Sequence, residues 1–203
     1  MKVLTIILIV CCFLSCTKTP ELLFVDHFDG TSLNEEHWNY ELGDGCPNLC
    51  GWGNDERQLY TKENVSVTGG NLVIRATHID SIYQSGRITT KDKIEFTYGS
   101  IEVRAKLPKG QGIWPAIWML GANIDTNKWP ACGEIDIMEY VGKEPHIIHT
   151  SLHTTASSGN TINTKKTINT RIEDGFHIYK TIWTEEAIQF QIDNKNHMTT
   201  YNP

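Results

Sequence analysis

Apolar and polar side chains alternate along most of the chain, which is the two-residue period of β-strands rather than the 3.6-residue period of α-helices. In residues 101–107, Ile, Val, Ala and Leu alternate with Glu, Arg and Lys, and residues 176–183 and 188–192 repeat the pattern. Gly, Asn, Asp or Pro bound these segments, as expected at turns between strands. Further strands are predicted over residues 22–28, 72–78, 86–89, 114–120, 134–140 and 149–154.

Helix signals are sparse. Only Ser32–Trp38 is predicted to form a helical turn, with Ser32 as its N-cap. Many short strands without a long helix indicate an all-β fold, a β-sandwich of the jelly-roll type. The sequence contains no internal repeat and no linker, so residues 22–203 are predicted to form one domain.

The N-terminal segment has the features of an export signal. Lys2 precedes residues 3–14, in which only Thr5 is polar. A membrane-spanning helix needs about 20 apolar residues, so this run matches the shorter apolar region of a signal peptide. Ser15 and Cys16 follow, which resembles the bacterial lipobox, where the cysteine becomes the lipidated first residue.

This pattern predicts a signal peptide over residues 1–15, lipidation of Cys16 and a short linker over residues 16–21. We expect an exported protein, anchored through the lipid to the bacterial outer membrane or cell surface. The alternative is an ordinary secretory signal, which leads to a secreted protein.

Charge and aromatic content narrow the range of partners. Lys and Arg total 18 against 24 Asp and Glu, a formal net charge of −6. An acidic chain lacks the basic surface that neutralises a phosphate backbone, so no nucleic acid partner is expected. The 6 Trp, 7 Tyr and 6 Phe suit a core and a surface that stacks on flat, uncharged ligands such as sugar rings. We expect a monomer.

Three of the six cysteines, Cys46, Cys50 and Cys132, lie beyond the signal peptide and its lipidation site at Cys16. Cys46 and Cys50 flank a short loop that can close as a local disulfide in an oxidising compartment, which leaves Cys132 as a free thiol. A zinc site requires a fourth ligand with tetrahedral spacing, and the histidines are too scattered to supply one. No metal is expected at these cysteines.

Acidic side chains are concentrated in residues 133–140, Gly-Glu-Ile-Asp-Ile-Met-Glu-Tyr. Side chains alternate between the faces of a strand, so Glu134 and Asp136 share one face. A one-residue β-bulge near Met138 would bring Glu139 to the same face and leave the apolar residues in the core. Two glutamates brought to a carboxyl separation of about 5 Å are the nucleophile and acid/base of a retaining glycosidase. Asp136 adds a like charge between them.

These acids have two other interpretations. A solvated polar face is unfavourable here, because three like charges repel and the segment supplies no Lys or Arg. A calcium site is also disfavoured, because calcium loops use Asp- and Asn-rich turns with Gly, whereas this segment is an apolar strand.

Five segments in order resemble glycoside hydrolase family 16, and within it the bacterial laminarinases, which are endo-β-1,3-glucanases. They are residues 51–56 (Gly-Trp-Gly-Asn-Asp-Glu) with Gln58 and Tyr60, residues 85–88 (Ser-Gly-Arg-Ile), residues 112–120, residues 134–139 and residues 149–153. The extra Met138 resembles the bulged branch of laminarinases, agarases and carrageenases.

The resemblance implies a concanavalin A-like lectin/glucanase jelly roll that cleaves internal β-1,3-glucosidic bonds of laminarin-type β-glucans with retention, without a cofactor. It implies that Glu134 is the nucleophile, Asp136 its electrostatic assistant and Glu139 the general acid/base. It also implies a set of sugar-binding residues: Asn54, Arg87, Trp114, Trp118 and His153. The alternatives are a hydrolase of the same fold acting on a galactan such as agar or carrageenan, and a non-catalytic β-glucan-binding lectin.

Several of these residues also have structural interpretations. Trp114 and Trp118 lie four apart and can belong to the core, and His153 can be a structural histidine. Arg87 can be a surface charge, although a guanidinium is an expected balance for three carboxylates. Trp129, in the segment that leads into the acidic strand, is a further candidate for stacking on substrate.

The chain departs from the family in two places. His27 stands where the family commonly has an acidic residue near a structural calcium, and neutral imidazole is a poor calcium ligand. The family continues for several strands beyond Pro203, so we expect a sandwich that lacks its C-terminal strands. Both departures argue against a structural calcium.

Overall fold

The computed structural model describes residues 21–159, 163–167 and 172–201. The predicted signal peptide and Cys16 lie outside the described residues. The chain divides into two compact units, one formed by residues up to 33 with 42–87 and the other by residues 34–41 with 88–203. The one-domain prediction for residues 22–203 stays a prediction. No helix within the described ranges is long and apolar enough to cross a membrane.

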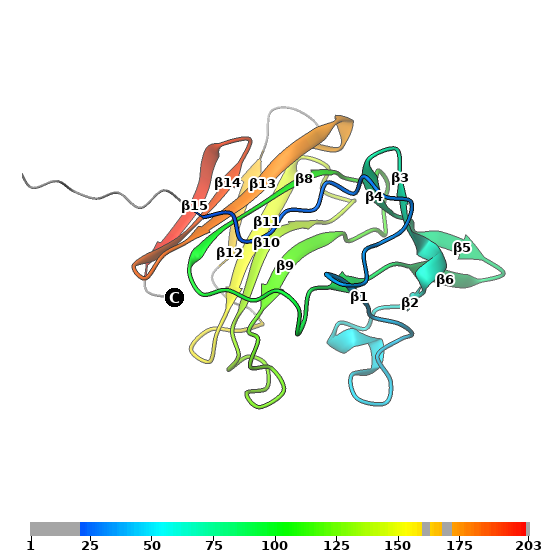
Figure 1. Cartoon of the computed structure of the whole chain (residues 1–203), viewed down its shortest axis with the longest axis horizontal. Helices are drawn as coiled ribbons and strands as arrows, with labels where there is room; N and C mark the ends of the chain where they lie inside the picture. Colours follow the sequence, from blue (N-terminus) through cyan, green and yellow to red (C-terminus); the bar gives the residue numbers. More distant parts are fainter. Residues whose placement is uncertain (1–20, 160–162, 168–171, 202–203) are drawn as a thin grey trace, which may run out of the picture. The chain divides into compact units, whose positions relative to one another are not determined.

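The second unit contains two antiparallel sheets of four strands each (Figure 1). One sheet has the order β12 (Asn163–Thr167), β11 (Ile147–His153), β10 (Glu134–Tyr140) and β9 (Ala116–Leu120). The other has the order β15 (Lys195–Tyr201), β14 (Ala187–Ile192), β13 (Phe176–Trp183) and β8 (Gly99–Lys106). A short pair, β1 (Asn39–Tyr40) with β7 (Ile88–Thr89), and the 3₁₀ turn η3 (Ile172–Asp174) complete the unit.

The core of this unit lies between the two sheets, as in a β-sandwich. Tyr140 and Ile148 from the first sheet and Tyr179 and Ile192 from the second belong to one buried cluster. Alternation explains this, because every second residue of β8 is half-buried while its neighbours are exposed. The predicted all-β jelly roll is confirmed in these paired sheets.

The first unit consists of short strands and a disulfide-closed loop. The hairpin β3 (Val65–Thr68) with β4 (Asn71–Ile74) is antiparallel, and β6 (Ile82–Ser85) pairs with β5 (Thr77–Ile79) and β2 (Leu59–Tyr60). This unit also contains two 3₁₀ turns. In the sequence, η1 (Cys50–Gly53) precedes β2, and η2 (Lys62–Asn64) lies between β2 and β3. A disulfide joins Cys46 to Cys50, and Cys132 is a free thiol.

The turn before η1 requires glycine at position 45. Gly45 has φ +82°, and a Cβ there would lie 2.1 Å from the carbonyl oxygen of Leu49. Only a residue without a side chain fits such an approach of the backbone at positive φ.

One predicted strand is absent from the described part of the chain, and the predicted helical turn begins later than expected. Residues 22–28 form no strand, because Phe28 has φ 55° and its N–H bonds back to the carboxylate of Asp26, which is a local turn. Ser32 caps no helix. Asn34 takes that place, since its side-chain oxygen accepts the N–H of Glu36, and a single turn leads directly into β1.

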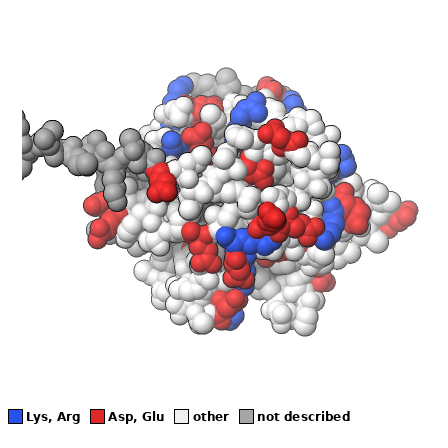
Figure 2. Space-filling model, viewed as in Figure 1, with Lys and Arg blue, Asp and Glu red and all other residues white. Residues whose placement is uncertain are grey.

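Charged side chains are mixed in sign on the face drawn in Figure 2. Blue and red groups are scattered over a largely uncharged surface.

Candidate active site

A bulge in β10 places the three acidic side chains on the outer face of the sheet. Asp136 pairs with Ser151 while Glu139 pairs with His149, so β10 uses one residue more than β11 between these pairs. The register with β9 shifts at the same place. Ile137 and Met138 are both buried in the core, which returns Glu139 to the side of Asp136. The predicted bulge is confirmed.

The neighbouring strands add side chains to this outer face. Residues directly opposite each other in an antiparallel pair point to the same side of the sheet. Asp136 is opposite Trp118 on β9 and Ser151 on β11, and Glu134 is opposite His153. The predicted residues Glu134, Asp136, Glu139, Trp118 and His153 therefore lie on one face.

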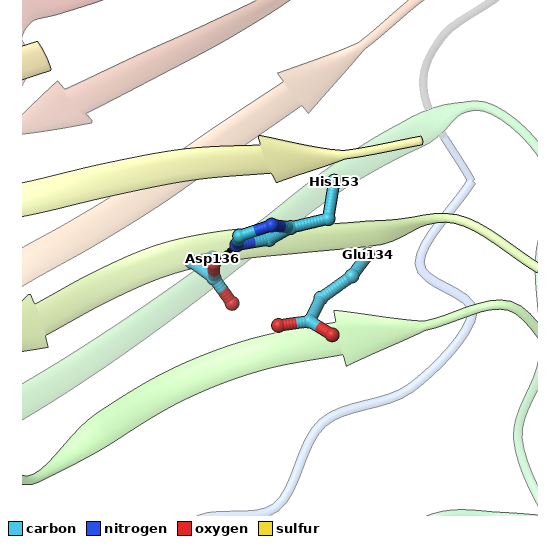
Figure 3. A group of neighbouring side chains, drawn as sticks. All are labelled: Glu134, Asp136 and His153. Carbon is cyan, nitrogen blue, oxygen red and sulfur yellow. Dashed lines mark hydrogen bonds and ion pairs between the residues drawn. The ribbon is translucent and has the colours of Figure 1, made fainter. Parts of the chain in front are cut away.

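Asp136 is buried among groups that favour its protonated form. Burial, followed by the negative charges of Glu134 and Glu139 and a hydrogen bond with Glu134, raises the pKa of Asp136 to about 9. His153 Nε2 lies 3.1 Å from Asp136 Oδ2. Figure 3 shows the carboxyl group of Glu134 turned toward that of Asp136, with the His153 ring against Asp136. At neutral pH Asp136 is thus a carboxylic acid whose O–H donates a hydrogen bond to Glu134.

Glu139 has a different environment. Trp114 donates its indole N–H to Glu139 Oε1 over 3.1 Å, and the Ser151 hydroxyl donates to Oε2 over 3.3 Å. Each carboxylate oxygen therefore has its own donor, which orients the group on the sheet surface. Ser151 is a site residue that the sequence prediction missed, although it lies between His149 and His153 with the spacing of one strand face.

The indole rings around the acids are accessible. Trp114 is 54% exposed, and it lines a cavity of about 390 Å³ together with Gly112, Ile113, Val141 and Lys143. Trp118 is 36% exposed and Trp129 is 45% exposed. Neither Trp114 nor Trp118 belongs to the core, so both rings are placed to stack on a ligand.

The remaining predicted sugar-binding residues lie in the first unit, where they form a network of their own. The Arg87 guanidinium stacks on Trp52 at 4.3 Å and approaches Tyr60 at 5.8 Å. The carboxylate of Glu56 accepts hydrogen bonds from the side chains of Asn54, Gln58 and Tyr60. Burial and this contact with Glu56 raise the pKa of Tyr60 to about 12. The sugar-binding roles of Asn54 and Arg87 stay predictions.

One group within the described residues has ligand atoms spaced for a metal ion. Glu134, Asp136 and His153 each offer one atom, and these atoms lie within 4.8 Å of one another. His153 Nε2 and Asp136 Oδ2 are at hydrogen-bond distance, 3.1 Å, and two carboxylates with one imidazole offer fewer oxygen ligands than the six to eight that calcium takes.

An all-β sandwich that presents three acids beside exposed indole rings is typical of carbohydrate-active proteins. Residues 53–203 match the model of glycosyl hydrolases family 16, and the chain belongs to that family.

Comparison with individual proteins supports the assignment to this family. A laminarinase of known structure from Flavobacterium sp. UMI-01 is 58% identical, with a TM-score of 0.86 over 89% of this chain and 78% of that one. A β-glucanase of Rhodothermus marinus is 40% identical over 191 residues, 87% of this chain and 65% of that protein. A keratan-sulfate endo-1,4-β-galactosidase of Sphingobacterium multivorum is 38% identical over 188 residues, 88% of this chain and 42% of that protein. The chain thus spans less than two thirds of the last two.

Proposed function

We propose that this protein is a retaining endo-glycoside hydrolase that cleaves internal β-1,3-glucosidic bonds of laminarin-type β-glucans. The observation that carries the proposal is the bulged strand β10, which presents Glu134, Asp136 and Glu139 on one face. A row of acidic groups close enough to keep one of them protonated serves catalysis better than sugar binding alone, because binding of a neutral ligand needs no such group.

Glu134 acts as the nucleophile in this reaction. Its carboxylate attacks the anomeric carbon and forms a covalent glycosyl ester while the glycosidic bond breaks. The protonated Asp136 supports this role, because its O–H donates a hydrogen bond to Glu134 and so orients the Glu134 carboxylate on the sheet surface.

Glu139 acts as the acid and then as the base. It gives its proton to the departing glycosidic oxygen and later takes a proton from the water that hydrolyses the ester. Two displacements at the same carbon leave the β configuration unchanged. The indole of Trp114 bonds to Glu139 and lines the adjoining cavity, which fits a binding place for the leaving sugar.

The choice of a β-1,3-glucan rests on the relatives. The Flavobacterium protein is named a laminarinase and the Rhodothermus protein a β-glucanase. A second candidate is a galactan hydrolase of the same fold, which is favoured by the 38% identity with the Sphingobacterium galactosidase.

Product analysis on laminarin, lichenan, agarose and keratan sulfate, side by side, tests the proposal. We expect β-configured oligosaccharides from laminarin at the highest rate, and no products from the Glu134→Gln control. Faster cleavage of either galactan would favour the second candidate. Binding to laminarin without cleavage of any substrate would make the protein a lectin.

We also propose that the protein is exported and lipid-anchored through Cys16, acts as a monomer, and reaches its polysaccharide at the cell surface. Ser15-Cys16 after the apolar segment supports the anchor. Cys16→Ser should release the protein from the membrane fraction or leave it unprocessed, whereas Cys12→Ser, in the apolar segment, should change neither. Unchanged membrane retention of Cys16→Ser would contradict the anchor.

A further inference from the structure

The contacts of His153 differ from those expected of a sugar ligand. We infer that His153 is a positioning residue, which donates a hydrogen bond from Nε2 to Asp136 and thereby directs the Asp136 hydroxyl toward Glu134. The inference rests on the proposed function, because it assigns Glu134 as the nucleophile.

Neither ring nitrogen of His153 is available to a substrate hydroxyl. Nε2 lies 3.1 Å from Asp136 Oδ2, and the two side chains are only 14% and 6% exposed. Nδ1 is buried and has no hydrogen-bond partner among the described residues. A histidine that binds sugar must present a nitrogen to solvent, and this ring presents neither.

The buried Nδ1 also determines where the ring proton lies. An N–H at Nδ1 would be a buried donor without an acceptor, which is costly. A proton on Nε2 instead has an acceptor in Asp136 Oδ2. Asp136 then accepts on Oδ2 and keeps its own proton for the hydrogen bond with Glu134. The chain of donors runs from His153 through Asp136 to the nucleophile.

Trp129 supports the ring from another side. Its ring centroid lies 5.8 Å from that of His153, with the planes tilted by 49°. Trp129 belongs to the segment between β9 and β10, whereas His153 ends β11. The imidazole therefore contacts both an indole and a carboxyl group, which restricts its rotation.

The test uses two amides that differ in reach. The nitrogen of a glutamine amide occupies the position of histidine Nε2, and that of an asparagine amide the position of Nδ1. His153→Gln keeps an N–H donor toward Asp136, and His153→Asn does not. On laminarin we expect His153→Asn to lower kcat about tenfold or more, with KM within about twofold of wild type. His153→Gln should recover most of kcat.

His177 provides the matched control. It also pairs with an aspartate, since its Nδ1 lies 2.7 Å from Asp193 Oδ2, but it belongs to β13 in the other large sheet. His177→Asn should therefore leave kcat and KM near wild type. A higher KM with unchanged kcat for His153→Asn would make His153 a sugar ligand. Equal kcat losses in His153→Gln and His153→Asn would also overturn the inference, because the N–H would then be irrelevant.

Two measurements separate this inference from folding and from the proposed function. In a Glu139→Gln background, adding His153→Asn should leave the Kd for a laminari-oligosaccharide unchanged if the site stays folded, and a weaker Kd would contradict positioning. Side-chain ¹⁵N NMR of the wild type should show the His153 proton on Nε2, and a proton on Nδ1 would contradict the inference. If wild type cleaves no glucan, the proposed function fails and the NMR result still decides the geometry.

Discussion

Asp136 and Glu139 lie on the same strand, yet their carboxyl groups have different surroundings. Asp136 is enclosed by Glu134 and His153 and holds a proton, whereas Glu139 is oriented by two neutral donors next to an exposed indole. Glu134 thus shares a hydrogen bond with Asp136 while Glu139 is held by Trp114 and Ser151, so the two glutamates that a double displacement uses in different roles have different partners.

The first prediction separates the two glutamates. With an activated aryl β-glucoside, Glu139→Ala should still form the glycosyl ester, because a good leaving group needs little protonation. Hydrolysis of the ester should stall for want of a base, and azide, which needs none, should restore turnover and give the β-azide. Glu134→Ala should give no ester, and azide should yield the α-azide. The measurement is product stereochemistry by NMR, and the opposite pattern would reverse the two roles.

The second prediction concerns Trp114, which combines a stacking surface with an N–H on Glu139. Trp114→Phe keeps an aromatic ring and removes the N–H, so kcat should fall by about fivefold to tenfold while KM changes little. Trp114→Ala removes both, so KM should rise as well. Steady-state kinetics on laminarin distinguish these effects. An unchanged kcat in Trp114→Phe would show that Trp114 acts only as a stacking surface.

At the scale of elements, strands with long alternating patterns could be predicted from sequence and short or polar strands could not. The predicted ranges 134–140 and 176–183 coincide with β10 and β13. β2 and β7 have two residues each, which is too few to show a period. β12 and β15 are polar edge strands of their sheets, where apolar alternation is not required.

The candidate site was predictable to a similar extent. Side-chain parity along β10 was enough to predict the bulge and the common face of the acids. The contacts of Ser151 with Glu139 and of His153 with Asp136 depend on the register between β10 and β11. That register results from long-range packing, which one sequence does not encode as a local pattern.

The third prediction tests the bulge as an element. Deleting Met138 restores strict alternation and still leaves the acids on one face, so the variant should fold, less stably by roughly 2–5 kcal/mol for the lost buried side chain. Inserting one Ala after Met138 should be worse, because it turns Tyr140, which is fully buried, toward the face of the acids. Urea unfolding monitored by circular dichroism compares the two. Equal stability of both variants would show that parity does not govern this strand.

At the scale of the whole molecule, the candidate residues come from segments that are distant in sequence and belong to different units. The acids, Trp114, Trp118 and His153 lie in the unit that contains both large sheets, while Asn54 and Arg87 lie in the other. The first unit fixes its own residues through the Cys46–Cys50 disulfide and the hydrogen bonds to Glu56. Each unit therefore preorganises its part of the candidate residues internally.

The free energy of unfolding of the whole protein should depend on pH, because Asp136 is buried among acids. Its pKa is raised to about 9 in the folded protein, against about 4 in an unfolded chain. Between those pH values the unfolded chain loses this proton while the folded protein keeps it, so the contribution of Asp136 to stability falls as pH rises. An uncharged isostere would not have this dependence.

The fourth prediction is therefore that Asp136→Asn stabilises the fold increasingly with pH while it lowers activity. The amide keeps an acceptor for His153 and a donor for Glu134, so the gain should be small near pH 5 and should grow by about 1.4 kcal/mol for each pH unit up to pH 8, with a rise in Tm of about 2–4 °C per kcal/mol. Asp193→Asn is the control, because its effect on stability should change with pH in the opposite direction. Burial alone would raise the pKa of Asp193, but hydrogen bonds from His177 and the Ile178 N–H outweigh burial and lower this pKa. The charged form of Asp193 therefore stabilises the fold. That variant should lose stability at neutral pH and approach wild type in acid. Thermal melts from pH 4 to 9 measure both, and a stability gain of Asp136→Asn that does not grow with pH would mean that Asp136 is ionised in the folded protein.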